Sequence, residues 1–148
     1  MSSRRKIREC ALQLMFQWDI NRGDPTIQQE LYWTSTRRSV DDELQLLANR
    51  LFMQTIENLD RIDARIKKQA ENWRMDRMSA VDRNVLRIAI QELSAPVWEE
   101  STPPAVVINE ALDIARRYSG EAAVPFINGV LDGVRKSLAE DPVQTAKQ

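Results

Sequence analysis

The sequence predicts an all-α protein, a single domain of about six to seven helices. Only 4 glycines and 6 prolines occur among its 148 residues, and nearly all lie where a helix would begin or end. Apolar residues recur at steps of three and four, which is the period of one helix face. No run between turn signals alternates apolar and polar side chains as a half-buried strand does. We therefore expect one helical domain over residues 1–140, followed by a frayed tail at 141–148.

Two helices are predicted in the first quarter of the chain. The first covers residues 4–20, and the segment 21–25 (NRGDP) ends it because glycine and proline disfavour continued helix. A shorter helix is expected from Thr26 to about Arg37. The apolar face of the first helix comprises Ile7, Cys10, Ala11, Leu14, Met15 and Trp18, and one side of the second presents Ile27, Leu31 and Thr34.

The middle of the chain predicts a long helix and then a central one. Negative charge at residues 41–43 favours a helix start, and apolar positions then continue from Leu44 to Ile66 as one long core-facing helix. Ser79 and Asp82 have the spacing of a capping box ahead of an apolar band that extends to Leu93. Because that band is so dense, we expect its helix to be covered on several sides.

Two further helices are predicted after a loop at residues 94–103, where Pro96 and Pro103 disfavour helix. Pro104 suits the first position of the next helix, which ends at Gly120. The last helix starts near residues 124–125 and contains Gly129 and Gly133, each costing about 1 kcal/mol relative to alanine. We expect close helix packing at both glycines, with Asn128 hydrogen-bonded inside.

Composition excludes several classes of function. There is no histidine and only one cysteine, so His-dependent triads, His-ligated metals, intrachain disulfides and multi-thiolate zinc sites are ruled out. The longest apolar runs fall far below the ~20 residues of a membrane span. Polar residues interrupt the N-terminal segment where a signal peptide would be apolar, so we expect a cytoplasmic protein. The net charge of −1 does not exclude nucleic-acid binding, because the charges are unevenly distributed.

The N-terminal segment is the clearest candidate binding site. Arg4, Arg5, Lys6 and Arg8 place four cations in five residues. Such a run can neutralise phosphates and release their counterions, although a solvated basic tail is an alternative interpretation. Phe16, on the same helix, would be available to stack on a base if Trp18 is buried, and the other interpretation is that the second helix covers it.

Catalysis has little support in the sequence. Asn109 and Glu110 offer one amide and one carboxylate, which are better suited to orienting backbone or arginine groups than to transferring protons. Glycine-rich phosphate loops are absent. We therefore expect no enzyme activity, no metal and no cofactor.

Three blocks of the chain resemble the NusB family of transcription antitermination factors. They are residues 4–19 (RRKIRECALQLMFQWD), residues 81–93 (VDRNVLRIAIQEL) and residues 104–134 (PAVVINEALDIARRYSGEAAVPFINGVLDGV). The resemblance implies two small helical bundles packed together and a binding function. It further implies recognition of single-stranded boxA-like RNA with NusE, a small-subunit ribosomal protein, in an antitermination complex with RNA polymerase that acts notably on ribosomal RNA operons.

The resemblance also implies roles for individual residues. The residues that match the RNA-binding segment and its aromatic contacts are Arg4, Arg5, Lys6, Arg8, Phe16 and Phe126. Asp82 and Tyr118 match positions near the NusE and RNA surface. A second hypothesis, from another class, is a protein-interaction module or homodimer for which RNA is incidental. Exposure of Tyr32, Trp33 or Trp98 would favour it, since aromatic residues are enriched at interface hot spots.

Overall fold

All regular structure in the described part of the chain is helical. The computed structural model describes residues 3–36, 41–70, 75–98 and 100–140, so the predicted tail at 141–148 lies outside it. The all-α prediction is confirmed. The elements are α1 (Ser3–Asn21), α2 (Pro25–Thr36), α3 (Asp42–Glu57), α4 (Leu59–Gln69), η1 (Met75–Arg77), α5 (Ala80–Ser94), α6 (Pro104–Tyr118), η2 (Glu121–Ala123) and α7 (Val124–Glu140), where η marks a short 3₁₀ turn.

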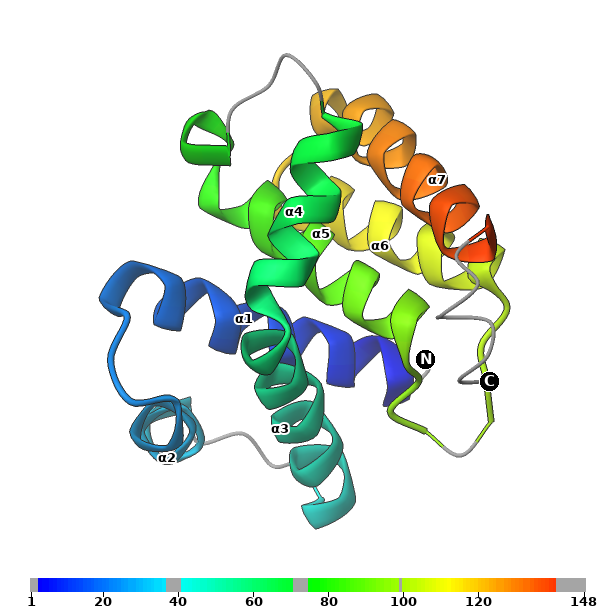
Figure 1. The fold of residues 1–148 in the computed structure, drawn as a ribbon. Coiled ribbons are helices and arrows are strands. Elements are labelled where there is room, and N and C mark those ends of the chain that lie inside the picture. Colours follow the sequence, from blue (N-terminus) through cyan, green and yellow to red (C-terminus); the bar gives the residue numbers. More distant parts are fainter. Residues whose placement is uncertain (1–2, 37–40, 71–74, 99, 141–148) are drawn as a thin grey trace.

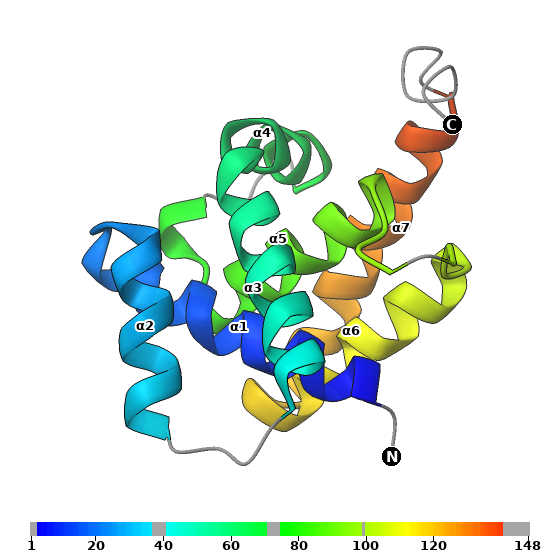
Figure 2. The ribbon, with the colours of Figure 1, turned by 90° about the horizontal axis from the view of Figure 1, so that it is seen from below.

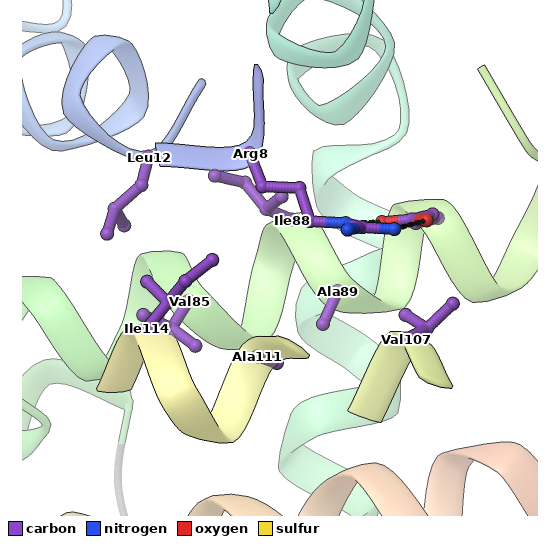
Figure 3. A pocket seen from close by; sticks show the side chains of 9 residues that line it. Arg8, Leu12, Val85, Ile88, Ala89, Val107, Ala111 and Ile114 are labelled. Carbon is purple, nitrogen blue, oxygen red and sulfur yellow. Dashed lines mark hydrogen bonds and ion pairs between the residues drawn. The ribbon is translucent and has the colours of Figure 1, made fainter. Parts of the chain in front are cut away.

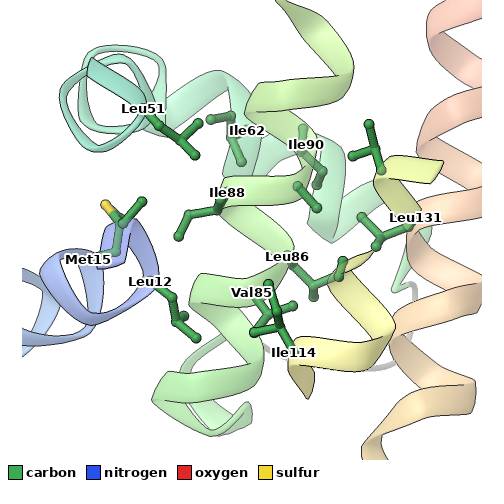
Figure 4. Packing of buried hydrophobic residues seen from close by; sticks show 14 of the residues in the cluster. Leu12, Met15, Leu51, Ile62, Val85, Leu86, Ile88, Ile90, Ile114 and Leu131 are labelled. Carbon is green, nitrogen blue, oxygen red and sulfur yellow. The ribbon is translucent and has the colours of Figure 1, made fainter. Parts of the chain in front are cut away.

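Helix α5 lies at the centre of the molecule, as its dense apolar band predicted. It contacts α1, α3, α4, α6 and α7. Figures 1 and 2 show α1, α2 and α3 grouped on one side and α4 to α7 on the other, which matches the expected pair of helical bundles. In Figure 4, Met15 of α1 and Leu51 of α3 approach one face of α5, where Ile88 projects, and Leu131 of α7 lies beyond the opposite face. The core is therefore shared by both groups.

The prediction of one long helix from Leu44 to Ile66 is wrong, because the chain turns at Asn58. The Asn58 side-chain amide donates to the Gln54 carbonyl at 3.0 Å and to the Gln91 side-chain oxygen at 3.1 Å. These bonds hold a turn between α3 and α4, with Asn58 at φ −105°. Both helices keep an apolar face, so periodicity alone did not detect the break. The turn brings α4 against α7.

The face predicted for α2 points to solvent. Ile27 and Leu31 are 55% and 59% exposed, so this face is not part of the core. The inward side instead carries Tyr32, whose hydroxyl donates to Gln13 at 2.6 Å, and Trp33, whose indole N–H donates to the Asn49 side chain at 2.8 Å. Two large rings with hydrogen-bond partners bury more surface than the aliphatic pair does.

The predicted helix boundaries at α5 and α6 are confirmed. The Ser79 hydroxyl accepts a hydrogen bond from the Asp82 backbone N–H at 3.1 Å, which caps α5, and Pro104 opens α6. None of the described helices combines the length and the apolar character needed to cross a membrane.

The two glycines of α7 differ from each other. A Cβ at Gly133 would lie 2.1 Å from the Gln69 side-chain oxygen, so close packing is confirmed there. A Cβ at Gly129 would meet nothing within 4 Å, and both Gly129 and Asn128 are exposed. The packing prediction is therefore wrong for Gly129, which lies on the outer side of the helix.

Candidate nucleic-acid interface

The four predicted cations lie in the first turns of α1, but they have different surroundings. Arg8 is buried and makes two hydrogen bonds to Glu92 of α5, at 2.8 and 2.6 Å. Their side chains are only 6% and 1% exposed. Such a pair is costly to break, because either partner alone would leave a buried charge. Arg8 therefore fastens α1 to α5.

The pocket beside Arg8 is too small to be a ligand site. Figure 3 shows Arg8 running along one side of it, with Leu12, Val85 and Ala111 among its apolar walls. Its volume is about 20 Å³, enough for little more than one water molecule. This space belongs to the packing between α1, α5 and α6.

Arg5 is fastened to α6 instead. Its guanidinium donates to both Glu110 carboxylate oxygens at 2.7 and 2.8 Å, and to Asp113 at 2.9 Å. The hydrogen bond from Arg5 lowers the pKa of Glu110 and, in turn, Glu110 raises the pKa of Arg5. The expectation that Glu110 orients an arginine is thus confirmed. About a quarter of the Arg5 side chain remains exposed.

Arg4 and Lys6 are the less constrained cations. The Arg4 guanidinium lies 4.8 Å from the centre of the Trp98 ring, and its Nη1 donates to the Thr102 hydroxyl at 3.4 Å. Both are neutral partners, and a cation–π contact leaves the charge in place. Lys6 is half-buried, and among the described residues it has no carboxylate partner. These two side chains can offer positive charge to an incoming phosphate.

Phe16 continues the same side of α1 as Arg5 and Glu9. Eleven residues at 100° each bring Phe16 back to within about 20° of Arg5 around the helix. Arg117, near the end of α6, donates to Glu9 at 3.2 Å, so this side of α1 runs along α6 toward the α6–α7 turn. Phe16 is half-buried and Trp18 is buried, so the condition on Trp18 is met and the stacking role of Phe16 stays a prediction.

The remaining predicted residues lie at helix ends of the second group. Phe126, in the first turn of α7, and Tyr118, the last residue of α6, are half-buried and pack against the edge of the core. Asp82 lies in the first turn of α5, and its Oδ1 is buried without a hydrogen-bond partner in the described part of the chain. The binding roles of these three residues stay predictions.

Sequence reasoning missed the role of Asp19, a buried carboxylate that joins three arginines. It accepts from Arg83 at 2.8 Å, Arg22 at 2.8 Å and Arg87 at 3.0 Å. Burial opposes its ionisation, but the hydrogen bonds from Arg83 and Arg22 and the charge of Arg87 outweigh burial and lower the pKa of Asp19 to about 2. In the sequence, Asp19 was visible only as an acidic residue next to Trp18 that interrupts the apolar segment. Nothing there indicated its arginine partners.

The aromatic residues that would favour a protein-interaction module are not exposed. Tyr32 is 1% exposed and Trp98 is 8% exposed. Trp33 is partly buried and hydrogen-bonded to Asn49. This observation does not support the second hypothesis, and a homodimer stays a prediction.

Comparison with known proteins identifies similar chains of nearly the same length. The model of the NusB family matches residues 5–136. A transcription antitermination protein NusB from Solibacter usitatus is 40% identical over 147 residues, covering 99% of this chain and 98% of that one. NusB of T. maritima has a TM-score of 0.80 at 33% identity and covers 100% of this chain and 99% of that one. A chain from the crystal structure of antitermination factors NusB and NusE in complex with dsRNA has a TM-score of 0.80 at 26% identity, covering 93% and 98%.

Proposed function

The chain belongs to the NusB family, and on this basis we propose that it is a transcription antitermination factor that binds boxA-type single-stranded RNA together with NusE. In that complex it helps RNA polymerase read through termination signals, notably on ribosomal RNA operons. One observation carries the proposal beyond family membership. The α1–α6 side of the molecule has the cations Arg4, Arg5 and Lys6 at one end and half-buried aromatic rings at the other.

This arrangement supports different roles for the individual cations. Arg4 and Lys6 contact phosphates directly: Arg4 contacts the neutral Trp98 ring and Thr102 hydroxyl, and Lys6 is partly exposed. Arg5 contributes in part, since a phosphate competes with Glu110 for it. Arg8 keeps its bond to Glu92 and acts as a positioning residue that holds the cationic segment on the surface. Affinity comes from the phosphate contacts and is sensitive to salt.

Base recognition falls to Phe16 and Phe126. Stacking of a base on an aromatic side chain contributes about 1–3 kcal/mol per base. NusE contacts are assigned to Asp82 and Tyr118, which lie at the helix ends on this side of the second group. The unpaired Asp82 oxygen would gain a donor from a partner there.

The protein acts in the cytoplasm, and residues 1–140 form one domain. It acts by binding and not by catalysis. The absence of histidine supports a non-catalytic role, because the commonest proton shuttle at neutral pH is missing. NusE and RNA are its partners in the antitermination complex, and it works there without a cofactor.

A salt series of RNA-binding affinities tests the proposal. The wild type is expected to bind a boxA-type RNA more tightly than a scrambled RNA of equal length. Changing Arg4→Ala and Lys6→Ala together should flatten the slope of log affinity against log salt by about 1.4, at about 0.7 for each phosphate contact on a single strand. The Phe126→Ala variant should lose much of the preference for boxA-type over scrambled RNA, while the salt slope of its affinity changes little.

The control for charge is the double variant Lys67→Gln with Arg77→Gln, which removes two exposed cations from other elements. It should leave the slope unchanged. A duplex of the same RNA, compared in parallel, measures the preference for the unpaired form. Equal affinity for boxA-type and scrambled RNA, or a flat salt dependence in the wild type, would contradict the proposed function.

A further inference from the structure

A second group of cations lies on α4, outside the site described above. We propose that Arg61, Arg65 and Lys68 form a phosphate-binding surface that extends the RNA path beyond the N-terminal cations. The inference rests on the proposed function. It adds a binding surface on which the RNA that flanks the recognition element lies.

Helix geometry places the three cations on one face of α4. Their spacings of four and three residues repeat the helical period. Figure 1 shows α4 lying across α5 with α7 beside it. Arg61, Arg65 and Lys68 border a hollow of about 210 Å³ between α4 and α7, and Arg61 and Arg65 also border a hollow of about 180 Å³ between α4 and the end of α5. Two neighbouring hollows thus share the same two arginines.

The lining of both hollows is cationic or neutral. The remaining side chains include Gln69 and Ser137 in the first and Asn58 and Gln91 in the second. No carboxylate borders either hollow in the described part of the chain. The amides and the hydroxyl can donate hydrogen bonds to phosphate oxygens. A surface with this chemistry fits an anion.

The described acidic residues of α4 and α7 near this surface have other partners or lie on another face. Asp63 of α4 is bound to Arg87, at 2.9 Å for each of its oxygens. Asp132 of α7 is held by Arg135 at 2.7 Å and by Lys136 at 3.1 Å. Asp60 is exposed, but it lies about 100° around α4 from Arg61.

Arg61 and Lys68 keep their charge available. Arg61 donates a hydrogen bond from its Nη2 to the neutral side-chain oxygen of Asn58, at 2.8 Å. Both side chains are exposed. The hollows are smaller than the ~300–1,000 Å³ typical of small-molecule sites, so they suit backbone phosphate groups better than a free nucleotide.

A chain of contacts connects this surface to the N-terminal cations. Ala95 borders the α4–α5 hollow, and two residues later the Val97 carbonyl accepts a hydrogen bond from the exposed Arg50 at 3.3 Å. The next residue, Trp98, carries the Arg4 guanidinium over its ring. The segment 95–98 thus borders the α4–α5 hollow and contacts Arg50 and Arg4 in turn, and Asp41 and Glu43 border the hollow on the other side of Arg4. Because this path continues an RNA site, we assign it to RNA and not to an acidic protein.

The test compares three RNAs and three proteins. One RNA is the boxA-type element alone. The other two carry an additional unpaired stretch of about ten uridines, one at each end of the element, a length within the range that one small domain covers. The proteins are the wild type, the double variant Arg61→Gln with Lys68→Gln, and the charge-matched control Lys67→Gln with Arg77→Gln. Affinities are measured over a salt series, and circular dichroism verifies that each variant is folded.

The wild type and the control are expected to bind at least one extended RNA more tightly and with a steeper salt slope than the short RNA. The Arg61→Gln/Lys68→Gln variant should bind the short RNA like the wild type but lose about 1.4 of the slope for the extended RNA, at about 0.7 for each phosphate. If extension gains nothing in the wild type, or if that variant keeps the whole gain, the inference is overturned. An acidic protein partner would produce the first of these outcomes.

The same data separate this inference from the proposed function. Failure of the wild type to prefer the short boxA-type RNA over its scrambled form would overturn the proposed function. The difference between the two double variants on the extended RNA would still decide whether the α4 surface binds phosphates. Intact binding of the short RNA without any gain on extension would overturn the α4 surface alone.

Discussion

Replacing Asp19 by asparagine should destabilise the protein strongly and in a pH-dependent way. The Asp19 side chain is 3% exposed and is shared by Arg22, Arg83 and Arg87, so it ties the end of α1 to α5. Asparagine keeps the size but removes the negative charge. Arg87 is also 3% exposed and would keep only Asp63 as a carboxylate partner among the described residues.

The magnitude follows from the pKa and from burial. The pKa of Asp19 falls from 3.8 to about 2, which corresponds to roughly 2 kcal/mol of stability from ionisation. Leaving buried arginines short of a partner brings the expected loss at neutral pH to about 3 kcal/mol. Because the folded pKa is the lower one, this stability is present above the unfolded value and disappears as pH falls through the folded value. The difference between wild type and variant should therefore shrink between pH 4 and pH 2.

Urea unfolding followed by circular dichroism, at pH 7 and at several values down to about pH 2.5, measures this difference. The matched control is Asp132→Asn, which removes an exposed carboxylate paired with Arg135 and Lys136 on the surface of α7. Water screens that pair, so little change is expected. A loss at pH 7 no larger than that of the control, or a loss that stays constant with pH, would refute the reasoning.

Four further variants test local parts of the structure. Gly129→Ala should raise the free energy of unfolding by up to about 1 kcal/mol, while Gly133→Ala should gain less because a packed side chain must move; equal gains in urea unfolding would contradict the packing. Ser79→Ala should cost about 1 kcal/mol through loss of the α5 cap, and thermal unfolding showing no shift would argue against that cap. Glu110→Gln should leave Arg5 held by Asp113 alone among the described carboxylates and steepen the salt slope of RNA binding by up to about 0.7, so an unchanged slope would show that Arg5 does not reach phosphate.

Local sequence patterns were sufficient to locate the helices. Pro104, the Ser79 cap and the apolar band of α5 act over a few residues, and each was found where the pattern placed it. The errors arose where a tertiary contact overrode the pattern. The Asn58 turn depends on a bond to Gln91 of another helix, and the outward face of α2 depends on the partners available to Tyr32.

The candidate site likewise depends partly on local sequence and partly on tertiary contacts. The sequence by itself determined that the chain is helical, that its N-terminal segment is cationic and that it resembles the NusB family, because composition and short-range spacing are properties of the chain alone. Only the tertiary structure decided which of these cations are held by the carboxylates of other helices. Arg8 meets Glu92 across 84 positions and Arg5 meets Glu110 across 105, and such pairings exist only after α5 and α6 have packed against α1. The residue type sets the charge of a side chain, whereas the packing of the helices decides which carboxylate pairs with it.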